Sequence, residues 1–194
     1  MEITTDNFLG GKVRLIQEAT GYLATSDSVL AAAAVRAKAG ESVLDVGCGN
    51  GVILYCLNAR VQNLTLVGIE KQSVLADYAR KNALLNHADA HIICEDIFQP
   101  RTRIHGIQYH HVVTNPPYYT EDVIRAHPQT ATAYHQTTDL SHWIRFCLKH
   151  VRAKGTFTLI HRTEALPEIL NILQKSPLGA IEVIPIYSKQ TQPA

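Results

Sequence analysis

The sequence predicts an α/β fold, in which helices cover a mainly parallel sheet. Short apolar runs alternate with longer segments of helical periodicity, the rhythm of consecutive β-α-β units. Polar or acidic residues directly follow several of the apolar runs. The 194 residues are 46% hydrophobic and 18% charged, which is enough chain for one sizeable core. We therefore expect a single domain over residues 1–194 that begins with a basic arm at about residues 1–25.

The expected elements follow from these patterns in chain order. The arm can form a hairpin, and a helix near 27–38 is started by Ser26 or Asp27 as its N-cap. Apolar runs predict strands near 42–46, 64–69, 90–94, 109–114, 155–161 and 181–187. Helical patterns fall near 51–60, 72–86, 139–151 and 164–175. Residues 119–138 show neither pattern, and a loop of that length inside a domain is usually functional or mobile.

A glycine-rich loop from Asp45 to Gly51 follows the strand expected at 42–46. Glycines let the chain turn sharply and let a ligand approach the backbone, close to the N–H groups of the next helix. The loop lacks the third glycine spacing of the dinucleotide fingerprint, which disfavours a nicotinamide cofactor.

Acidic residues close three successive strands, namely Asp45, Glu70 and Asp96. Open parallel sheets bind ligands outside the carboxyl ends of their strands, where a carboxylate can accept hydrogen bonds from ribose hydroxyls. Glu70 is the best placed for that role. Each acid could instead be a solvated strand end or a helix cap, and Asp45 could be a turn acceptor.

The tetrapeptide from Asn115 to Tyr118 reads Asn-Pro-Pro-Tyr and follows the strand expected at 109–114. Each proline fixes its own φ and has no N–H, so the turn is stiff and presents acceptors. The Asn115 side-chain oxygen and the Pro116 carbonyl can accept from one amino group, while the Tyr118 ring can stack on a planar base. Asn-Pro-Pro also occurs as an ordinary turn in surface loops.

Taken together, these motifs resemble the Rossmann-like S-adenosylmethionine-dependent methyltransferases that methylate amino groups. The opening stretches at 8–17 and 25–32 resemble the bacterial tRNA1(Val) adenine-N6 methyltransferase family, and the likeness covers nearly the whole chain. The resemblance implies a three-layer sandwich and methyl transfer to the exocyclic N6 amine of an adenine in a tRNA anticodon loop. It also implies a C-terminal seventh strand, antiparallel to the others, which we expect this chain to lack.

The resemblance assigns roles to residues of these motifs. It implies that the cofactor is held by Asp45, Gly47, Cys48, Gly49, Gly51, Glu70, Lys71, Asp96, Ile97 and Asn115. Within that set, Asp45, Gly47, Gly49 and Glu70 would hold the methionine and ribose parts, and Asp96 the adenine amino group. The catalytic group would consist of Asn115, Pro116, Pro117 and Tyr118.

Composition bears on several other classes of protein. The sequence has no uncharged apolar stretch of about 18 residues, as a membrane span requires, and no basic, apolar signal sequence. Its four cysteines lack C-x-x-C spacing, so we expect free thiols in a reducing cytoplasm. The ten histidines do not show metal-ligand spacing, and no metal is expected.

RNA binding would need a local basic patch, because the formal net charge is only +1. The candidates are Lys12, Arg14, Arg101, Arg103 and Arg125, each of which could equally be a solvated surface residue. The expected partner is tRNA, and the sequence leaves a monomer and a homodimer open.

Two alternative functions remain. The same Asn-Pro-Pro-Tyr motif serves methyltransferases that act on glutamine in protein release factors or on adenine in DNA. The glutamine enzymes usually carry a separate helical N-terminal domain, for which this sequence shows no pattern. The second alternative is a cofactor-binding or RNA-binding protein without catalysis.

Overall fold

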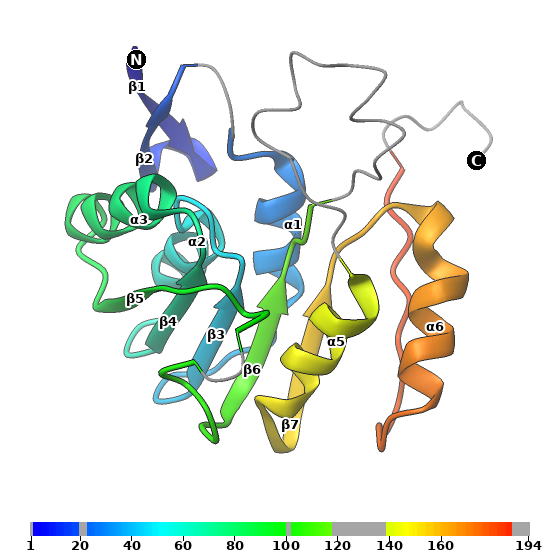
Figure 1. Cartoon of the computed structure of the whole chain (residues 1–194). Helices are drawn as coiled ribbons and strands as arrows, with labels where there is room; N and C mark the ends of the chain where they lie inside the picture. Colours follow the sequence, from blue (N-terminus) through cyan, green and yellow to red (C-terminus); the bar gives the residue numbers. More distant parts are fainter. Residues whose placement is uncertain (1, 20–22, 100–101, 118–138, 188–194) are drawn as a thin grey trace.

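A five-stranded parallel sheet forms the centre of the computed structural model, which describes residues 2–19, 23–99, 102–117 and 139–187 (Figure 1). Its strands run in the order β5-β4-β3-β6-β7, and every pairing between them is parallel. A separate antiparallel hairpin, β1 and β2, lies beside α3. The predicted α/β class and mainly parallel sheet are therefore confirmed.

The elements follow one another in the expected alternation. The hairpin joins β1 (Ile3–Phe8) to β2 (Val13–Glu18) through the short 3-10 turn η1 (Leu9–Gly11). The sheet strands are β3 (Ser42–Val46), β4 (Thr65–Glu70), β5 (Ala90–Cys94), β6 (Tyr109–Thr114) and β7 (Val151–Leu159). The helices are α1 (Ser26–Ala34), α2 (Val52–Arg60), α3 (Ser73–Leu85), α5 (Leu140–Lys149) and α6 (Leu166–Gln174), with η3 (Thr163–Ala165) before α6.

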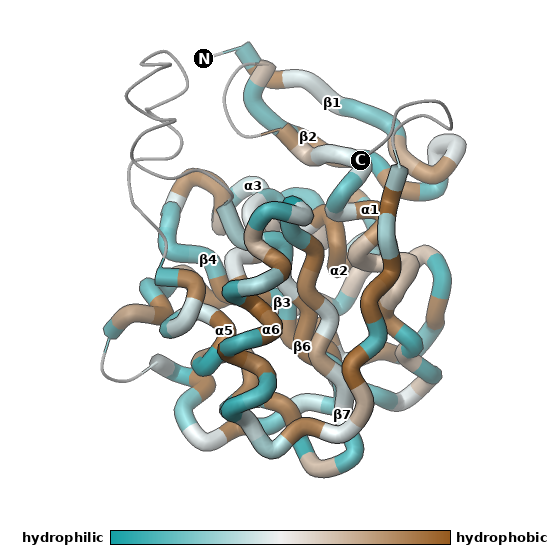
Figure 2. Tube along the Cα trace, turned by 90° about the vertical axis from the view of Figure 1, so that its right-hand side faces the viewer, coloured by the Kyte–Doolittle hydropathy of each residue, from teal (hydrophilic) through white to brown (hydrophobic). Residues whose placement is uncertain are grey.

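Two expectations about the C-terminal part differ from the structure. Strand β7 begins at Val151 and not near 155, because an irregularity between Val151 and Thr156, which includes Lys154 with φ 63°, shifts its register against β6. The strand expected at 181–187 is wrong, since these exposed residues pair with no described strand. Glu182 instead forms an ion pair with Arg36 (2.8 Å). Figure 2 shows that this segment is mainly apolar, which is the pattern that predicted a strand. Among the described residues, β7 is the last strand of the sheet and pairs only with β6.

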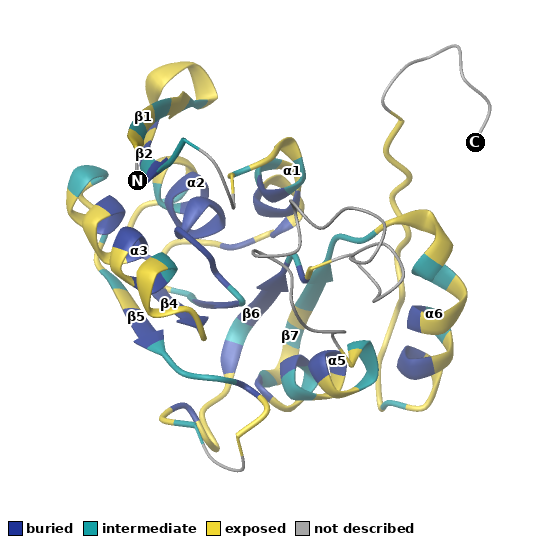
Figure 3. Cartoon of the chain, turned by 45° about the horizontal axis from the view of Figure 1, so that its top comes forward, coloured by how far each residue is buried: buried dark blue, intermediate teal, exposed yellow. Residues whose placement is uncertain are grey.

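The sheet separates two helical layers because side chains alternate across a strand. One face packs on α1, α2 and α3 through Val43, Leu66, Ile92 and Val113. The opposite face packs on α5 through Leu44, Val46, Val67, Ile69, Ile93 and Val112. Helix α6 adds a further cluster against α5 and β7. Figure 3 shows the buried residues on the sheet and on the inward faces of the helices, which is the expected three-layer sandwich.

The N-terminal hairpin is attached to α3 by two asparagine side chains. The Asn82 side chain accepts a hydrogen bond from the Ile16 amide (2.7 Å) and donates one to the Ile16 carbonyl (3.0 Å). One turn later, Asn86 makes the same pair of bonds with the Arg14 amide (2.9 Å) and carbonyl (2.7 Å). The two amides thus occupy the free edge of β2, as a neighbouring strand would. No helix of the described segments is long and apolar enough to cross a membrane.

Candidate active site

The glycine loop leaves β3 at the carboxyl edge of the sheet and leads into α2. Gly47, Gly49 and Gly51 have φ values of 73°, 55° and 87°, a region that other residues rarely adopt. A Cβ atom at Gly47 would also lie 2.7 Å from Cζ2 of Trp143 on α5. Glycine is therefore required there both by the turn and by the approach of the indole ring.

Glu70, the last residue of β4, braces this loop. Its Oε2 accepts a hydrogen bond from the Gly49 amide (3.0 Å), and its Oε1 accepts one from the Gln72 amide (2.8 Å). The side chain is buried, which raises the pKa of the carboxyl, although the two amide donors oppose that shift. The carboxyl thus fixes the position of the loop and faces the same sheet edge.

Asp45 presents a buried carboxyl without a partner. The residue is fully buried on β3, and neither of its carboxyl oxygens has a hydrogen-bond partner. Burial raises its pKa well above the ordinary value, and the nearby Glu70 raises it further. The side-chain oxygen of Asn50, in the glycine loop, also lacks a donor. Because buried polar atoms are normally satisfied, these oxygens indicate a site that receives hydrogen-bond donors from a ligand.

The remaining predicted cofactor residues continue along the same edge. Asp96 lies two residues beyond β5, half-buried, and its Oδ1 accepts a hydrogen bond from the Phe98 amide (2.9 Å). Ile97 is buried in the core below it, whereas Lys71, directly after β4, is exposed. Strands β3, β4 and β5 are neighbours, so the structure brings their carboxyl ends together.

The proline corner, residues Asn115 to Tyr118, directly follows β6. Strand β6 pairs with β3 on the side of β3 that faces away from β4. Asn115 is half-buried, and its Nδ2 donates a hydrogen bond to Ser28 Oγ of α1 (3.1 Å). Pro116 is buried and Pro117 is exposed, while Tyr118 lies outside the described residues. The Asn-Pro-Pro corner and the glycine loop therefore begin on adjacent strands, at one edge of the sheet.

A chain of hydrogen bonds ties the two loops together from below. Thr114 Oγ1 donates to the Val46 carbonyl (2.7 Å), and Trp143 Nε1 donates to the same Thr114 oxygen (2.9 Å). The indole ring that approaches Gly47 is thus held by the residue that precedes Asn115. Sequence reasoning missed Trp143, although it is the only tryptophan of the chain.

A second network connects the glycine loop to the hairpin. Gln17 Oε1 accepts hydrogen bonds from Asn50 Nδ2 and from the Ala24 amide, both at 3.0 Å. Asn82 Nδ2 donates to the Asn50 carbonyl (3.1 Å). Gln17, Asn50 and Asn82 are all buried. Sequence reasoning missed Gln17 and Asn82 too, although buried amides at otherwise apolar positions are a recognisable signal of such networks.

The basic residues predicted as candidates for RNA binding do not form one patch among the described residues. Lys12 and Arg14 are exposed on the hairpin, on the face opposite the buried Val13. Arg103 forms an ion pair with Glu95. Arg101 and Arg125 lie outside the described residues.

The parallel sheet has a glycine loop after its central strand, and acidic residues at the ends of the next two strands. This arrangement is typical of enzymes that bind a nucleoside cofactor, and it places the protein in the Rossmann-like methyltransferase class. Comparison with known families supports that class directly. The model of the family described as Methyltransferase small domain matches residues 21–140, and the chain belongs to this family. It is therefore an S-adenosylmethionine-dependent methyltransferase.

Individual relatives are similar over much of the chain. A tRNA1(Val) (adenine(37)-N6)-methyltransferase of Pedobacter heparinus is 28% identical over 177 residues, which cover 87% of this chain and 72% of the relative. A release factor glutamine methyltransferase of Aliivibrio fischeri is 26% identical over 134 residues, or 64% of this chain and 46% of the relative. Among solved structures, a 16S rRNA N2 G1207 methyltransferase of T. thermophilus matches with a TM-score of 0.60 at 19% identity, over 81% of this chain and 41% of that one. This last likeness shows the fold.

Proposed function

We propose that this enzyme transfers a methyl group from S-adenosylmethionine to the exocyclic N6 amine of an adenine in tRNA, in the cytoplasm. One observation carries the proposal. The Asn115 corner lies beside the glycine loop with its unpartnered Asp45 carboxyl, and Thr114 joins the two loops through its bond to Val46. A cofactor site and an acceptor site for an amine thus share one sheet edge.

The residues at this edge fit S-adenosylmethionine. The cofactor carries an ammonium group and a sulfonium charge, and the buried Asp45 carboxyl has two oxygens in need of donors or a positive charge. Glu70 ends the strand next to the loop, where a ribose would be bound, and Asp96 ends the strand after that. When bound, the cofactor supplies an activated methyl group together with its own leaving group.

The protein's own contribution is to position and polarise the target amine. Such an amine is a poor nucleophile because its lone pair is delocalised into the ring. Two oxygens would accept hydrogen bonds from the N–H groups of this amine, that of the Asn115 side chain and that of the Pro116 carbonyl. These bonds would favour a tetrahedral nitrogen and stabilise the positive charge that develops on it. The Asn115–Ser28 bond fixes the side-chain amide so that Nδ2 faces α1. The nitrogen becomes acidic after transfer, so it can lose its proton to water without a strong base.

A glutamine side chain would present a similar planar NH2 group, the nitrogen of its carboxamide, to Asn115 and Pro116, so this motif alone does not determine the substrate. The extent of the likeness favours tRNA, because the match to the P. heparinus tRNA enzyme covers 87% of this chain, against 64% for the glutamine enzyme.

Nucleoside analysis tests the proposal. Unmodified tRNA would be incubated with the protein and S-adenosylmethionine, digested, and examined by mass spectrometry, with DNA and a release factor in parallel reactions. We expect N6-methyladenosine in the tRNA digest. If only the release factor or only DNA became methylated, that molecule and not tRNA would be the substrate. Methyl transfer to none of the three would refute the proposal.

A further inference from the structure

Charge is unevenly distributed along this nearly neutral chain. Residues 140–163 contain five Lys and Arg residues and no Asp or Glu, while the rest of the sequence has 13 Lys and Arg against 17 Asp and Glu. The five cations are Arg145, Lys149, Arg152, Lys154 and Arg162. The acid-free segment comprises α5 and β7, which contact each other, so cations without neighbouring acids in the sequence gather in this part of the fold.

The end of β7 lies beside the candidate active site, because the Ile160 amide bonds to the Thr114 carbonyl, and helix α5 begins there too, where Trp143 approaches Gly47. The buried face of α5 consists of Trp143, Ile144 and Cys147, which pack in the core. Arg145 and Lys149 recur at helical spacing on the outer side and are exposed, and neither forms an ion pair with another described residue. By contrast, Arg36, Arg80 and Arg103 are each paired with an acid.

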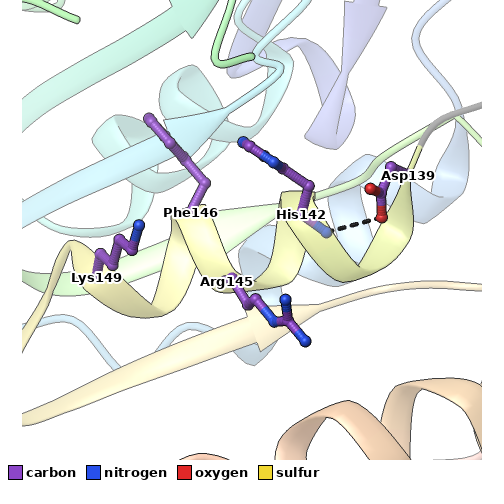
Figure 4. A pocket seen from close by; sticks show the side chains of 5 residues that line it. All are labelled: Asp139, His142, Arg145, Phe146 and Lys149. Atoms are coloured by element: carbon purple, nitrogen blue, oxygen red, sulfur yellow. Dashed lines mark hydrogen bonds between the residues drawn. The ribbon is translucent and has the colours of Figure 1, made fainter. Parts of the chain in front are cut away.

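A hollow of about 240 Å³ lies along the helix, lined by Asp139, His142, Arg145, Phe146 and Lys149. Figure 4 shows the five side chains along the helix, with His142 and Phe146 projecting side by side. Asp139 is the acid of the group, and its Oδ1 serves as the helix N-cap by accepting the His142 amide (2.9 Å). The lining of this hollow therefore combines cations with the half-buried ring of Phe146, which packs on the core and beside His150. Cations together with aromatic rings are typical of nucleic-acid surfaces.

The outer face of α5 is continuous with the rim of the candidate active site. The His142 ring lies 4.8 Å from the ring of Phe98, two residues beyond Asp96 at the rim. From that rim, the helix from Leu140 to Lys149 runs for about 15 Å, at about 1.5 Å per residue. A nucleic acid whose target base is bound in the active site can thus extend its phosphate backbone along this helix.

We propose that the outer face of α5, through Arg145 and Lys149, binds the phosphate backbone of the RNA that carries the target base. This inference rests on the proposed function, since it needs an RNA substrate. It moves the main RNA contact away from Lys12 and Arg14, because the described arm at 2–19 carries Glu2, Asp6 and Glu18 beside those two cations.

The test compares two double variants of the full chain. Arg145→Ala/Lys149→Ala removes the α5 cations, and Lys38→Ala/Lys175→Ala removes two exposed cations outside the acid-free segment. tRNA binding would be measured over a series of salt concentrations, with S-adenosylmethionine binding as a control for the cofactor site.

We expect the α5 variant to bind tRNA at least about tenfold more weakly at low salt. The slope of log affinity against log salt should become shallower by about 0.7–0.9 for each lost phosphate contact. Cofactor affinity should stay unchanged, and the Lys38/Lys175 variant should bind tRNA like the unaltered protein. An unchanged slope in the α5 variant, or an equal loss in both variants, would overturn the inference while leaving tRNA methylation intact. Failure of the unaltered protein to bind or methylate tRNA would instead overturn the proposed function, and the inference with it.

Discussion

Asn82 and Asn86 form a matched pair for testing whether the hairpin supports the cofactor loop. Each side chain holds one residue of β2 by two hydrogen bonds, but only Asn82 also bonds to the glycine loop, through the Asn50 carbonyl. Asn82→Ala would leave the Ile16 amide, the Ile16 carbonyl and the Asn50 carbonyl without this partner. At about 1 kcal/mol for each bond, the expected loss of unfolding free energy is about 3 kcal/mol.

This loss is large beside a typical total stability of about 5–15 kcal/mol, and for a chain of this length it predicts a fall in Tm of about 6–12 °C. Asn86→Ala removes two exposed bonds to Arg14, which water can replace. It also removes a part-buried bond to the Asn82 carbonyl (2.8 Å), but that carbonyl still accepts the backbone amide of residue 86. We therefore expect a loss of about 1 kcal/mol or less for Asn86→Ala.

Thermal unfolding and calorimetric titration with S-adenosylmethionine would be carried out on both variants. Asn82→Ala should lower both Tm and cofactor affinity, because the glycine loop loses one of its supports. Asn86→Ala should lower Tm slightly and leave cofactor affinity unchanged. Equal effects of the two substitutions on cofactor affinity, or unchanged affinity in Asn82→Ala, would refute the link between hairpin and loop.

Two further predictions concern buried or paired carboxyls. Asp45→Asn should make the cofactor-free protein more stable at pH 7 and weaken S-adenosylmethionine binding, as thermal shifts with and without cofactor would measure. The reason is that burial raises the pKa of Asp45, so this carboxyl destabilises the native protein as the pH rises above the ordinary Asp value of 3.8. A variant less stable than the unaltered protein would contradict this reasoning. Glu41→Gln should lower Tm at pH 7, because the hydrogen bond to His111 (2.8 Å) lowers the pKa of Glu41 and so stabilises the fold above the ordinary value of 4.5. The difference in Tm from the unaltered protein should shrink as the pH falls below about 4.5, and a pH-independent difference would argue against this origin.

The fold could be predicted from the sequence where local patterns determine it. Strands β3, β5 and β6 have the predicted bounds, because each is a short apolar run between turn or helix signals. Residues 181–187 are also a mainly apolar run, yet they form no strand, since a β pattern does not specify a partner and Pro185 offers no donor. The early start of β7 depends on the irregularity between Val151 and Thr156, which no local pattern signals.

The sequence predicted which residues of the candidate site lie at the ends of strands. It did not predict the side-chain contacts between them and the helices. Parallel topology alone brings Asp45, Glu70 and Asp96 to one edge, and their roles toward the cofactor stay predictions. The bond from Asn115 to Ser28 and the approach of Trp143 to Gly47 join residues far apart in the sequence. Such contacts follow from the packing of α1 and α5 on the sheet, which a single sequence does not fix.

The proline corner is tested most directly by single-turnover methyl transfer to tRNA in Asn115→Ala and in the unaltered protein, with cofactor affinity measured on both. We predict that the rate of transfer falls by at least about 10²–10³-fold in the variant, the effect of removing one polar group that stabilises developing charge. Tm should fall by only about 2–4 °C, the effect of losing the bond to Ser28 at about 1 kcal/mol, because the prolines keep the turn in shape. Cofactor affinity should fall far less than the rate of transfer. Transfer at a near-normal rate would contradict the role of Asn115 as the acceptor for the target amine.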